Sequence, residues 1–243
     1  SPFTVKSPHT IFREKTMPLH VSRIRAICFD VDGTLSDTDD VMQQRLAGLL
    51  QPFHFFFPKK DAHTIARRLV MALEAPSNFL IGIPDLLGFD KWLFAAFDWM
   101  SRHNRQGRKK FLLIPGVKEM LEQLSKRYPL AVVSARDERT TRLFLEQYDL
   151  VPYFKCIAVA QTCRHTKPFP DPVLWAAAQM GVPPADCLMV GDTTVDVRAG
   201  NAAGTQTIGV LCGFGEEPEL RKYQAGMILA TTPKLVQVLE SGE

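Results

Sequence analysis

The sequence predicts an α/β protein in which a doubly wound parallel sheet carries an inserted helical unit. Short apolar runs recur along the chain, and each run is nearly continuous rather than alternating, which is typical of strands buried on both faces. Helical patterns lie between most of these runs, as expected for parallel strands that are joined by crossover helices. After the first run, the segment 38–112 contains helical patterns and no convincing strand.

The predicted strands and helices follow one another in the order that this fold requires. Strands are expected at AICFDV (26–31), LAVVS (130–134), CIAVA (156–160), CLMVG (187–191), TIGVL (207–211) and MILA (227–230). Helices are expected at 115–128, 137–150, 170–181 and 233–243. For the last helix, Thr232 is a suitable N-cap and Pro233 suits the first turn.

These patterns divide the chain into three parts. Residues 1–22 are polar and are expected to form a flexible N-terminal extension. Residues 23–37 and 113–243 are expected to form the α/β core. Residues 38–112 are expected to form a helical domain that interrupts the core after its first strand, with helical stretches at 39–53, 61–74 and 84–103.

Composition and charge are those of an ordinary globular protein. Apolar residues make up 46% of the chain, charged residues 23%, and the net charge is +3, so nothing favours nucleic-acid or membrane binding. No apolar stretch reaches the ~18 residues that a membrane span needs, and the N-terminus lacks the apolar core of a signal peptide. Five cysteines without a CxxC pair favour free thiols and a cytoplasmic location.

Polar side chains follow four of the predicted strands. They are Asp30 and Asp32, Ser134, Lys167, and Asp192 with Asp196. In an open α/β sheet, ligands bind outside the carboxyl ends of the strands. We therefore expect these carboxylates, one hydroxyl and one ammonium to meet at one edge of the sheet.

This set of groups suits phosphoryl transfer to a carboxylate. Asp30 can attack phosphorus and form an aspartyl-phosphate, and Asp32 can protonate the leaving oxygen and later deprotonate the attacking water. Ser134 and Lys167 can donate hydrogen bonds to the phosphoryl oxygens. A hard cation such as Mg²⁺ prefers oxygen ligands, which Asp30 and Asp192 supply. Gly33 permits a tight turn out of the strand, where backbone N–H groups can face an anion.

The chain resembles the haloacid dehalogenase superfamily, in the branch of small phosphatases such as phosphoglycolate phosphatase and of enzymes similar to β-phosphoglucomutase. The resemblance rests on four motifs in order: DVDGT from Asp30, the strand-end Ser134, KPFPDP from Lys167, and GDTTVD, which contains Asp192 and Asp196. It covers residues 24–240. The sequence departs from the family at one place, because Ala135-Arg136 follow Ser134 where Asn or Gly is common.

The resemblance implies a Rossmann-like core with a helical cap at 38–112 and a Mg²⁺-dependent phosphatase acting on a small phosphorylated metabolite. It implies that Asp30, Asp32 and Lys167 are catalytic. Carried over position by position, the phosphate-binding residues are Ser134, Ala135, Gly33 and Lys167, and the metal site consists of Asp30, Asp32 and Asp192. The expected partner is the metabolite alone, with neither nucleic acid nor membrane, and the expected state is a monomer or homodimer.

Three other functions remain open from the residues. A sugar phosphomutase of the same superfamily would use the same motifs and differ in how its closed cap excludes water. A phospho-accepting signalling domain also gathers acids, a hydroxyl and a lysine around Mg²⁺, although it would lack the DGT sequence and the helical insertion. A catalytically silent binding protein of this family is the third. A calcium loop of the EF-hand type is excluded, because Gly33 and Val41 stand at the wrong positions of that pattern.

Overall fold

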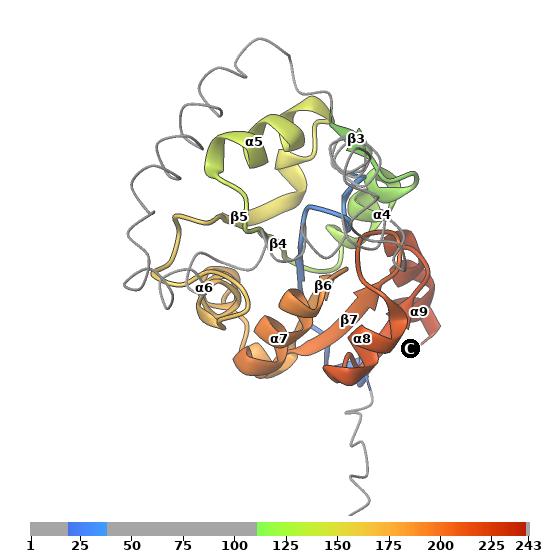
Figure 1. Ribbon diagram of the computed structural model, residues 1–243. Coiled ribbons are helices and arrows are strands. Elements are labelled where there is room, and N and C mark those ends of the chain that lie inside the picture. Colours follow the sequence, from blue (N-terminus) through green and yellow to red (C-terminus); the bar gives the residue numbers. More distant parts are fainter. Residues whose placement is uncertain (1–18, 38–110, 242–243) are drawn as a thin grey trace, which may run out of the picture.

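The computed structural model describes residues 19–37 and 111–241 (Figure 1). The predicted helical domain at 38–112 and its three helices therefore lie outside the described residues, apart from its last two positions. The described part forms the α/β core that the sequence predicts.

The core is built on a parallel six-stranded sheet with the order β5-β4-β1-β6-β7-β8. Its strands are β1 (Ala26–Phe29), β4 (Leu130–Val133), β5 (Phe154–Ala158), β6 (Cys187–Gly191), β7 (Gln206–Val210) and β8 (Met227–Leu229). All six predicted strands are present within two residues at each end. The strand order reverses at β1, so the crevice expected in doubly wound folds lies between β4, β1 and β6.

Helices cover both faces of this sheet (Figure 1). They are α4 (Val117–Leu124), α5 (Glu138–Gln147), α6 (Asp171–Met180), α7 (Thr194–Ala203), α8 (Glu217–Lys222) and α9 (Leu235–Ser241). Ile27 and Phe29 of β1 pack with α4, α5 and α9, whereas Ala26 and Cys28 pack with α6 and α7. Successive side chains of a strand point to opposite faces, and burial of both faces explains why β1 is apolar throughout.

A short antiparallel ribbon joins the two ends of the insertion. It pairs β2 (Ser36–Asp37) with β3 (Leu112–Leu113), and the Ser36 hydroxyl donates to the Leu112 carbonyl at 3.1 Å. The sequence did not predict this ribbon, because strands of two residues leave no readable period. It brings together two stretches of chain that the insertion separates.

The last helix begins differently from the prediction. Thr232 was expected to be its N-cap, but Thr232 begins a 3₁₀ helix (Thr232–Lys234) that runs into α9. Its buried hydroxyl donates instead to the Thr34 carbonyl at 2.6 Å. The side chain therefore fixes the turn after β1, a long-range contact that local capping rules do not reveal.

Residues just before the predicted start of the core at 23 contact the sheet. A 3₁₀ helix spans Val21–Arg23, and the His20 backbone N–H donates to Oε1 of Gln206 at 2.6 Å. The Gln206 amide returns a bond to the His20 carbonyl at 3.1 Å. Residues 20–22, which were assigned to the flexible extension, are thus attached to the start of β7.

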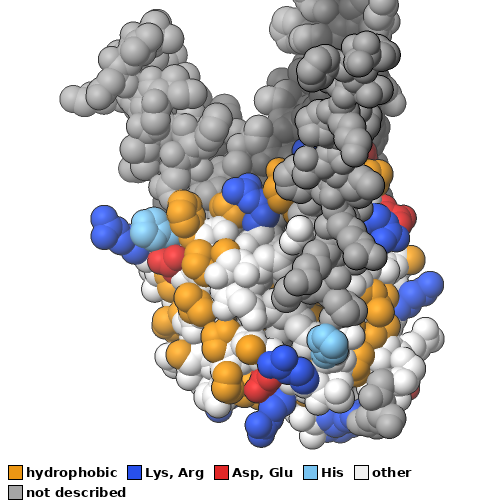
Figure 2. All heavy atoms as spheres, turned by 90° about the horizontal axis from the view of Figure 1, so that it is seen from below, with side chains coloured by type: hydrophobic (Ala, Val, Ile, Leu, Met, Phe, Trp, Pro, Cys, Tyr) orange, Lys and Arg blue, Asp and Glu red, His pale blue; other side chains and the backbone are white. Residues whose placement is uncertain are grey.

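Three remaining findings concern membrane spans, thiols and surface charge. In the described ranges, none of the helices combines the length and apolar character that crossing a membrane requires. All five cysteines are free thiols, as predicted. On the face seen in Figure 2, the described Lys and Arg side chains lie in separate small groups among hydrophobic and neutral ones.

Candidate active site

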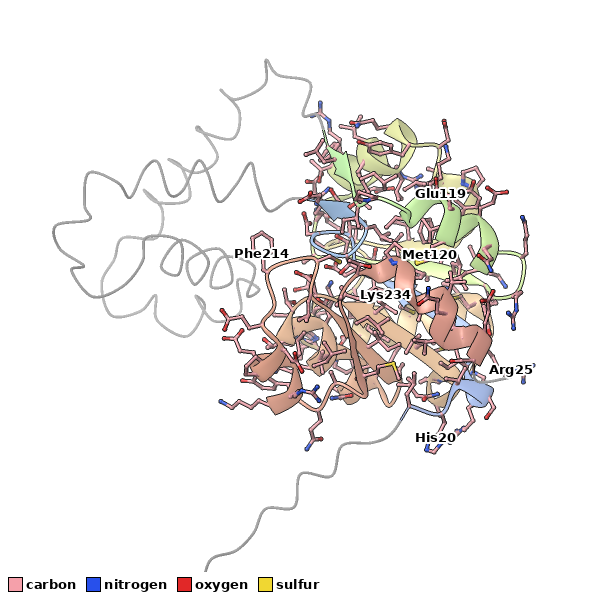
Figure 3. The ribbon with its side chains drawn as sticks, turned by 90° about the vertical axis from the view of Figure 1, so that its right-hand side faces the viewer. His20, Arg25, Glu119, Met120, Phe214 and Lys234 are labelled. Atoms are coloured by element: carbon pink, nitrogen blue, oxygen red, sulfur yellow. The ribbon has the colours of Figure 1, made fainter. Side chains whose placement is uncertain are left out.

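The candidate site lies at the carboxyl edge of the sheet, where the strand order reverses. Asp30 follows β1, Ser134 follows β4 and Asp192 follows β6. Figure 3 shows Arg25, just before β1, and Phe214, in the loop after β7, on opposite sides of the molecule. The predicted residues are on the side of Phe214, because its backbone N–H contacts Asp192.

Three carboxylates form a buried cluster at this edge. One oxygen from each of Asp30, Asp192 and Asp196 lies within 4.8 Å of the others. Their exposed fractions are 6%, 0% and 1%. Three acids packed this closely repel one another, so the cluster requires positive charge nearby.

Lys167 supplies part of that charge. Its ammonium donates to Oδ1 of Asp30 and to Oδ1 of Asp196, both at 2.6 Å. Burial disfavours the charged form of Lys167, yet the two carboxylates together raise its pKa above the ordinary value. The lysine therefore remains an ammonium at neutral pH and joins the end of β1 to α7.

The electrostatic balance at Asp30 is different. Burial raises the pKa of the Asp30 carboxyl from 3.8 to about 7. The Lys167 ammonium opposes this rise, whereas the charges of Asp196 and Asp32 add to it. A divalent cation among these acids would favour the carboxylate form and bring the pKa down.

Asp196 is held from two sides. Its Oδ2 accepts bonds from the backbone N–H and the hydroxyl of Thr193, at 3.0 and 2.8 Å, in a capping box that begins α7. Its Oδ1 accepts from Lys167. A single side chain therefore caps α7 and bonds to the lysine of the cluster.

Asp192 is packed so closely against two glycines that neither position has room for a side chain. Its Oδ2 accepts from the Phe214 backbone N–H at 2.7 Å, and its Oδ1 lies 3.5 Å from the Thr34 hydroxyl. A Cβ atom at Gly33 would lie 2.3 Å from Oδ2, and one at Gly213 would lie 2.2 Å from it. Gly33 also has a φ of +67°, which favours glycine.

Asp32 lies outside the cluster. Its two carboxylate oxygens accept bonds from Nε and a terminal nitrogen of Arg136. Ser134 is buried at the end of β4, with its Oγ accepting from the Arg136 backbone N–H at 3.1 Å, whereas Ala135 is exposed. The roles predicted for Asp32, Ser134 and Ala135 remain predictions.

Sequence reasoning did not identify three residues that shape this site. Arg136 was noted as a departure from the family pattern after Ser134. Its contact with Asp32 could not be predicted, because the two residues are 104 positions apart. Gly213 and Phe214 follow β7 in the stretch CGFG. Two glycines directly after a strand were the available signal, since such positions often mark a close approach of the backbone.

The family model for haloacid dehalogenase-like hydrolases matches residues 27–210. The chain belongs to this family. It is therefore a hydrolase, and the predicted resemblance is confirmed. The match includes every candidate residue from Asp30 to Asp196, and β7 up to its last residue.

Individual relatives are phosphatases by name. A pyrophosphatase PpaX from Anoxybacillus flavithermus is 27% identical over 219 residues, which are 89% of this chain and 97% of that protein. A phosphoglycolate phosphatase from Aquifex aeolicus is 30% identical over 197 residues, 79% of this chain and 86% of that protein. Among solved structures, a haloacid dehalogenase-like hydrolase from Streptococcus pneumoniae has a TM-score of 0.67 at 24% identity, covering 89% of this chain and 99% of that one.

Proposed function

We propose that this hydrolase is a Mg²⁺-dependent phosphatase that acts on a small phosphorylated metabolite through an aspartyl-phosphate on Asp30. The observation that carries the proposal is the buried cluster of Asp30, Asp192 and Asp196, which Lys167 joins at the crevice of the sheet. Burying three acids is unfavourable unless charges compensate for it. A cation together with a phosphoryl group fits that requirement.

The residues fit Mg²⁺ in their chemistry and spacing. The donor set consists of oxygen atoms only, and oxygens on opposite sides of Mg²⁺ lie about 4.2 Å apart at its usual bond length, close to the 4.8 Å limit of the cluster. Asp30 and Asp192 would hold the ion, with Asp196 beside it. The chemistry supplied by the bound ion is neutralisation of the acids and stabilisation of charge on the transferred group.

The chain's own residues perform the two steps. Lys167 holds Oδ1 of Asp30, and Oδ2 of Asp30 attacks phosphorus. As the Asp30–phosphorus bond forms, the bond to the leaving oxygen breaks, and Asp32 gives that oxygen a proton. Asp32 then takes a proton from a water molecule whose oxygen attacks phosphorus, the Asp30–phosphorus bond breaks, and phosphate leaves. Ser134 and Lys167 donate to the phosphoryl oxygens.

Phosphate release tests this function directly. The purified protein is assayed with p-nitrophenyl phosphate and with phosphoglycolate, pyrophosphate and several sugar phosphates, in Mg²⁺ and in EDTA. We expect release in Mg²⁺ that falls at least about a hundredfold in EDTA and that favours one compound. Equal rates in both buffers, or no release from any compound, would contradict the proposal.

A sugar phosphomutase uses the same residues, so the same samples are also analysed for products. After incubation with a sugar 1-phosphate, a phosphatase yields free sugar and inorganic phosphate. A mutase yields the isomeric sugar 6-phosphate. The isomer in place of phosphate would assign the mutase reaction to this chain.

Gly213→Ala is expected to weaken Mg²⁺ binding about 10- to 100-fold, as judged by the Mg²⁺ concentration for half-maximal phosphate release. The added methyl group would lie 2.2 Å from Oδ2 of Asp192 and would displace that carboxylate. Gly209→Ala is the matched control. Its methyl group meets the flexible end of Leu220 at 2.9 Å instead, so the Mg²⁺ requirement should not change. An unchanged requirement in Gly213→Ala would show that Asp192 does not depend on this close packing.

A further inference from the structure

Arg136 occupies both oxygens of Asp32. Its Nε donates to Oδ2 at 2.5 Å, and a terminal nitrogen donates to Oδ1. The two side chains are 13% and 22% exposed, so the pair is partly shielded from water. Asp32, which is expected to protonate the leaving oxygen, therefore has both carboxylate oxygens bonded to an arginine.

The guanidinium is held in place by aromatic rings and by the backbone. Its central carbon lies 5.1 Å from the ring centre of Phe111 and 5.9 Å from that of Phe144, a distance at which a cation is attracted to the ring. The Tyr148 hydroxyl fixes Phe111 by donating to its carbonyl at 2.7 Å. The Arg136 carbonyl accepts from the Ala160 backbone N–H at 2.9 Å. The guanidinium is therefore preorganised beside Asp32.

One nitrogen of this guanidinium has no acceptor. In the part of the chain that the structure describes, Nη1 of Arg136 is buried without a hydrogen-bond partner. A buried donor without a partner costs about 1–3 kcal/mol, and more when it is charged. Such a donor is rare in folded proteins, and at a substrate site it points to an acceptor that the substrate brings.

The position of Arg136 indicates which part of the substrate that is. Ser134, two residues earlier, is the predicted contact for the transferred phosphoryl group, and Asp32 is the predicted proton donor to the leaving oxygen. A guanidinium that touches Asp32 lies beyond the leaving oxygen, next to the rest of the leaving molecule. Arginine binds carboxylates and phosphates through paired N–H groups, so an anion at that end of the substrate would satisfy it.

We propose that Arg136 is a specificity-determining residue that selects substrates with a second anionic group, a carboxylate or a phosphate, on the leaving portion. This inference rests on the proposed phosphatase function. In the substrate-free enzyme Arg136 holds Asp32. When the substrate anion binds, Arg136 transfers hydrogen bonds to it, and the released Asp32 carboxylate takes up a proton from water and can then protonate the leaving oxygen. An ester without the second anion leaves Asp32 in its ion pair.

Matched pairs of substrates test the proposal. One pair is phosphoglycolate and its carboxamide, and the other is ethylene glycol bisphosphate and its monophosphate. For the wild type we expect a higher kcat/KM for the anionic member of at least one pair, which also distinguishes carboxylate from phosphate. Arg136→Gln should reduce that preference about 10- to 100-fold, the effect of one charged hydrogen bond, because the anionic member loses its contact and the other member no longer meets an Asp32 held in the ion pair. Arg139→Gln, at an exposed arginine three residues later, should retain the preference.

Two outcomes would overturn the inference. The preference could persist in Arg136→Gln, or both members of each pair could slow equally, in which case Arg136 only positions Asp32. If the wild type releases no phosphate from any compound, the proposed function fails. Whether Arg136 binds an anionic group is then tested by ligand binding. The Nε–H signal of Arg136 in ¹⁵N-labelled protein, identified by its loss in Arg136→Gln, should then shift with phosphoglycolate and not with its carboxamide. No shift with phosphoglycolate would refute the inference.

Discussion

Asp30→Asn is expected to reduce phosphate release about a thousandfold or more, the largest effect among the substitutions considered. An amide cannot attack phosphorus to form the aspartyl-phosphate, so the loss should appear in kcat for every substrate. The fold should remain intact. Burial and neighbouring acids disfavour the charged form of Asp30, and Lys167 keeps its bond to Asp196. We therefore expect a melting temperature within a few degrees of the wild type.

Phosphate release and thermal melting of the same preparation check both parts of this expectation. Asp149→Asn is a matched control, because Asp149 has an 85% exposed side chain and a φ of 56° that Asn also tolerates. It should leave rate and melting temperature unchanged. Ordinary phosphatase activity in Asp30→Asn would eliminate Asp30 as the nucleophile. If Asp30→Asn is both inactive and unfolded, the role of Asp30 as nucleophile is tested in the wild type instead. Acid quench then traps a phosphorylated Asp30, which mass spectrometry detects.

Lys167→Met is expected to lower the free energy of unfolding by about 3–5 kcal/mol, the usual cost of removing one partner from a buried ion pair. The substitution leaves the buried carboxylates of Asp30 and Asp196 without their shared cation. For a protein of this size that corresponds to a decrease of roughly 10 °C in melting temperature. Phosphate release should fall as well, because a donor to the phosphoryl oxygens is lost.

Urea unfolding in EDTA measures this effect without a contribution from bound metal. Lys126→Met serves as the control, because Lys126 forms an exposed pair with Glu122 and should change stability by less than about 1 kcal/mol. Adding Asp196→Asn to Lys167→Met should restore part of the stability, because it removes one of the uncompensated charges. A Lys167→Met protein as stable as the wild type would show that the cluster does not need this lysine.

Local sequence patterns predicted the sheet and the positions of its polar residues. Near-continuous apolar runs predict strands buried on both faces, and β1, β4 and β6 lie within those runs. Because parallel strands end at one edge, the residues that follow them had to gather there. Asp30 and Asp192 in the cluster, and Ser134 at the end of β4, follow from this rule.

The family motifs carried the prediction further than the periodicity did. Lys167 is in a loop without regular structure, and the motif order supported the site that its position after a predicted strand had indicated. Its contacts with Asp30 and Asp196, 137 and 29 residues away, lie beyond any local pattern. The motif also contains Asp196, which the structure places both in the cap of α7 and in the cluster.

The sequence by itself determined the order of elements and the chemical types present at the sheet edge. The tertiary structure alone decided which of these groups touch. It separates Asp32 from the acidic cluster and pairs it with Arg136, closes Gly213 and Phe214 around Asp192, and takes Thr232 from its expected cap to the Thr34 carbonyl. The physical reason is that each contact joins segments distant in the chain. Such contacts depend on packing and charge balance in three dimensions, whereas propensity and periodicity describe only neighbours along the chain.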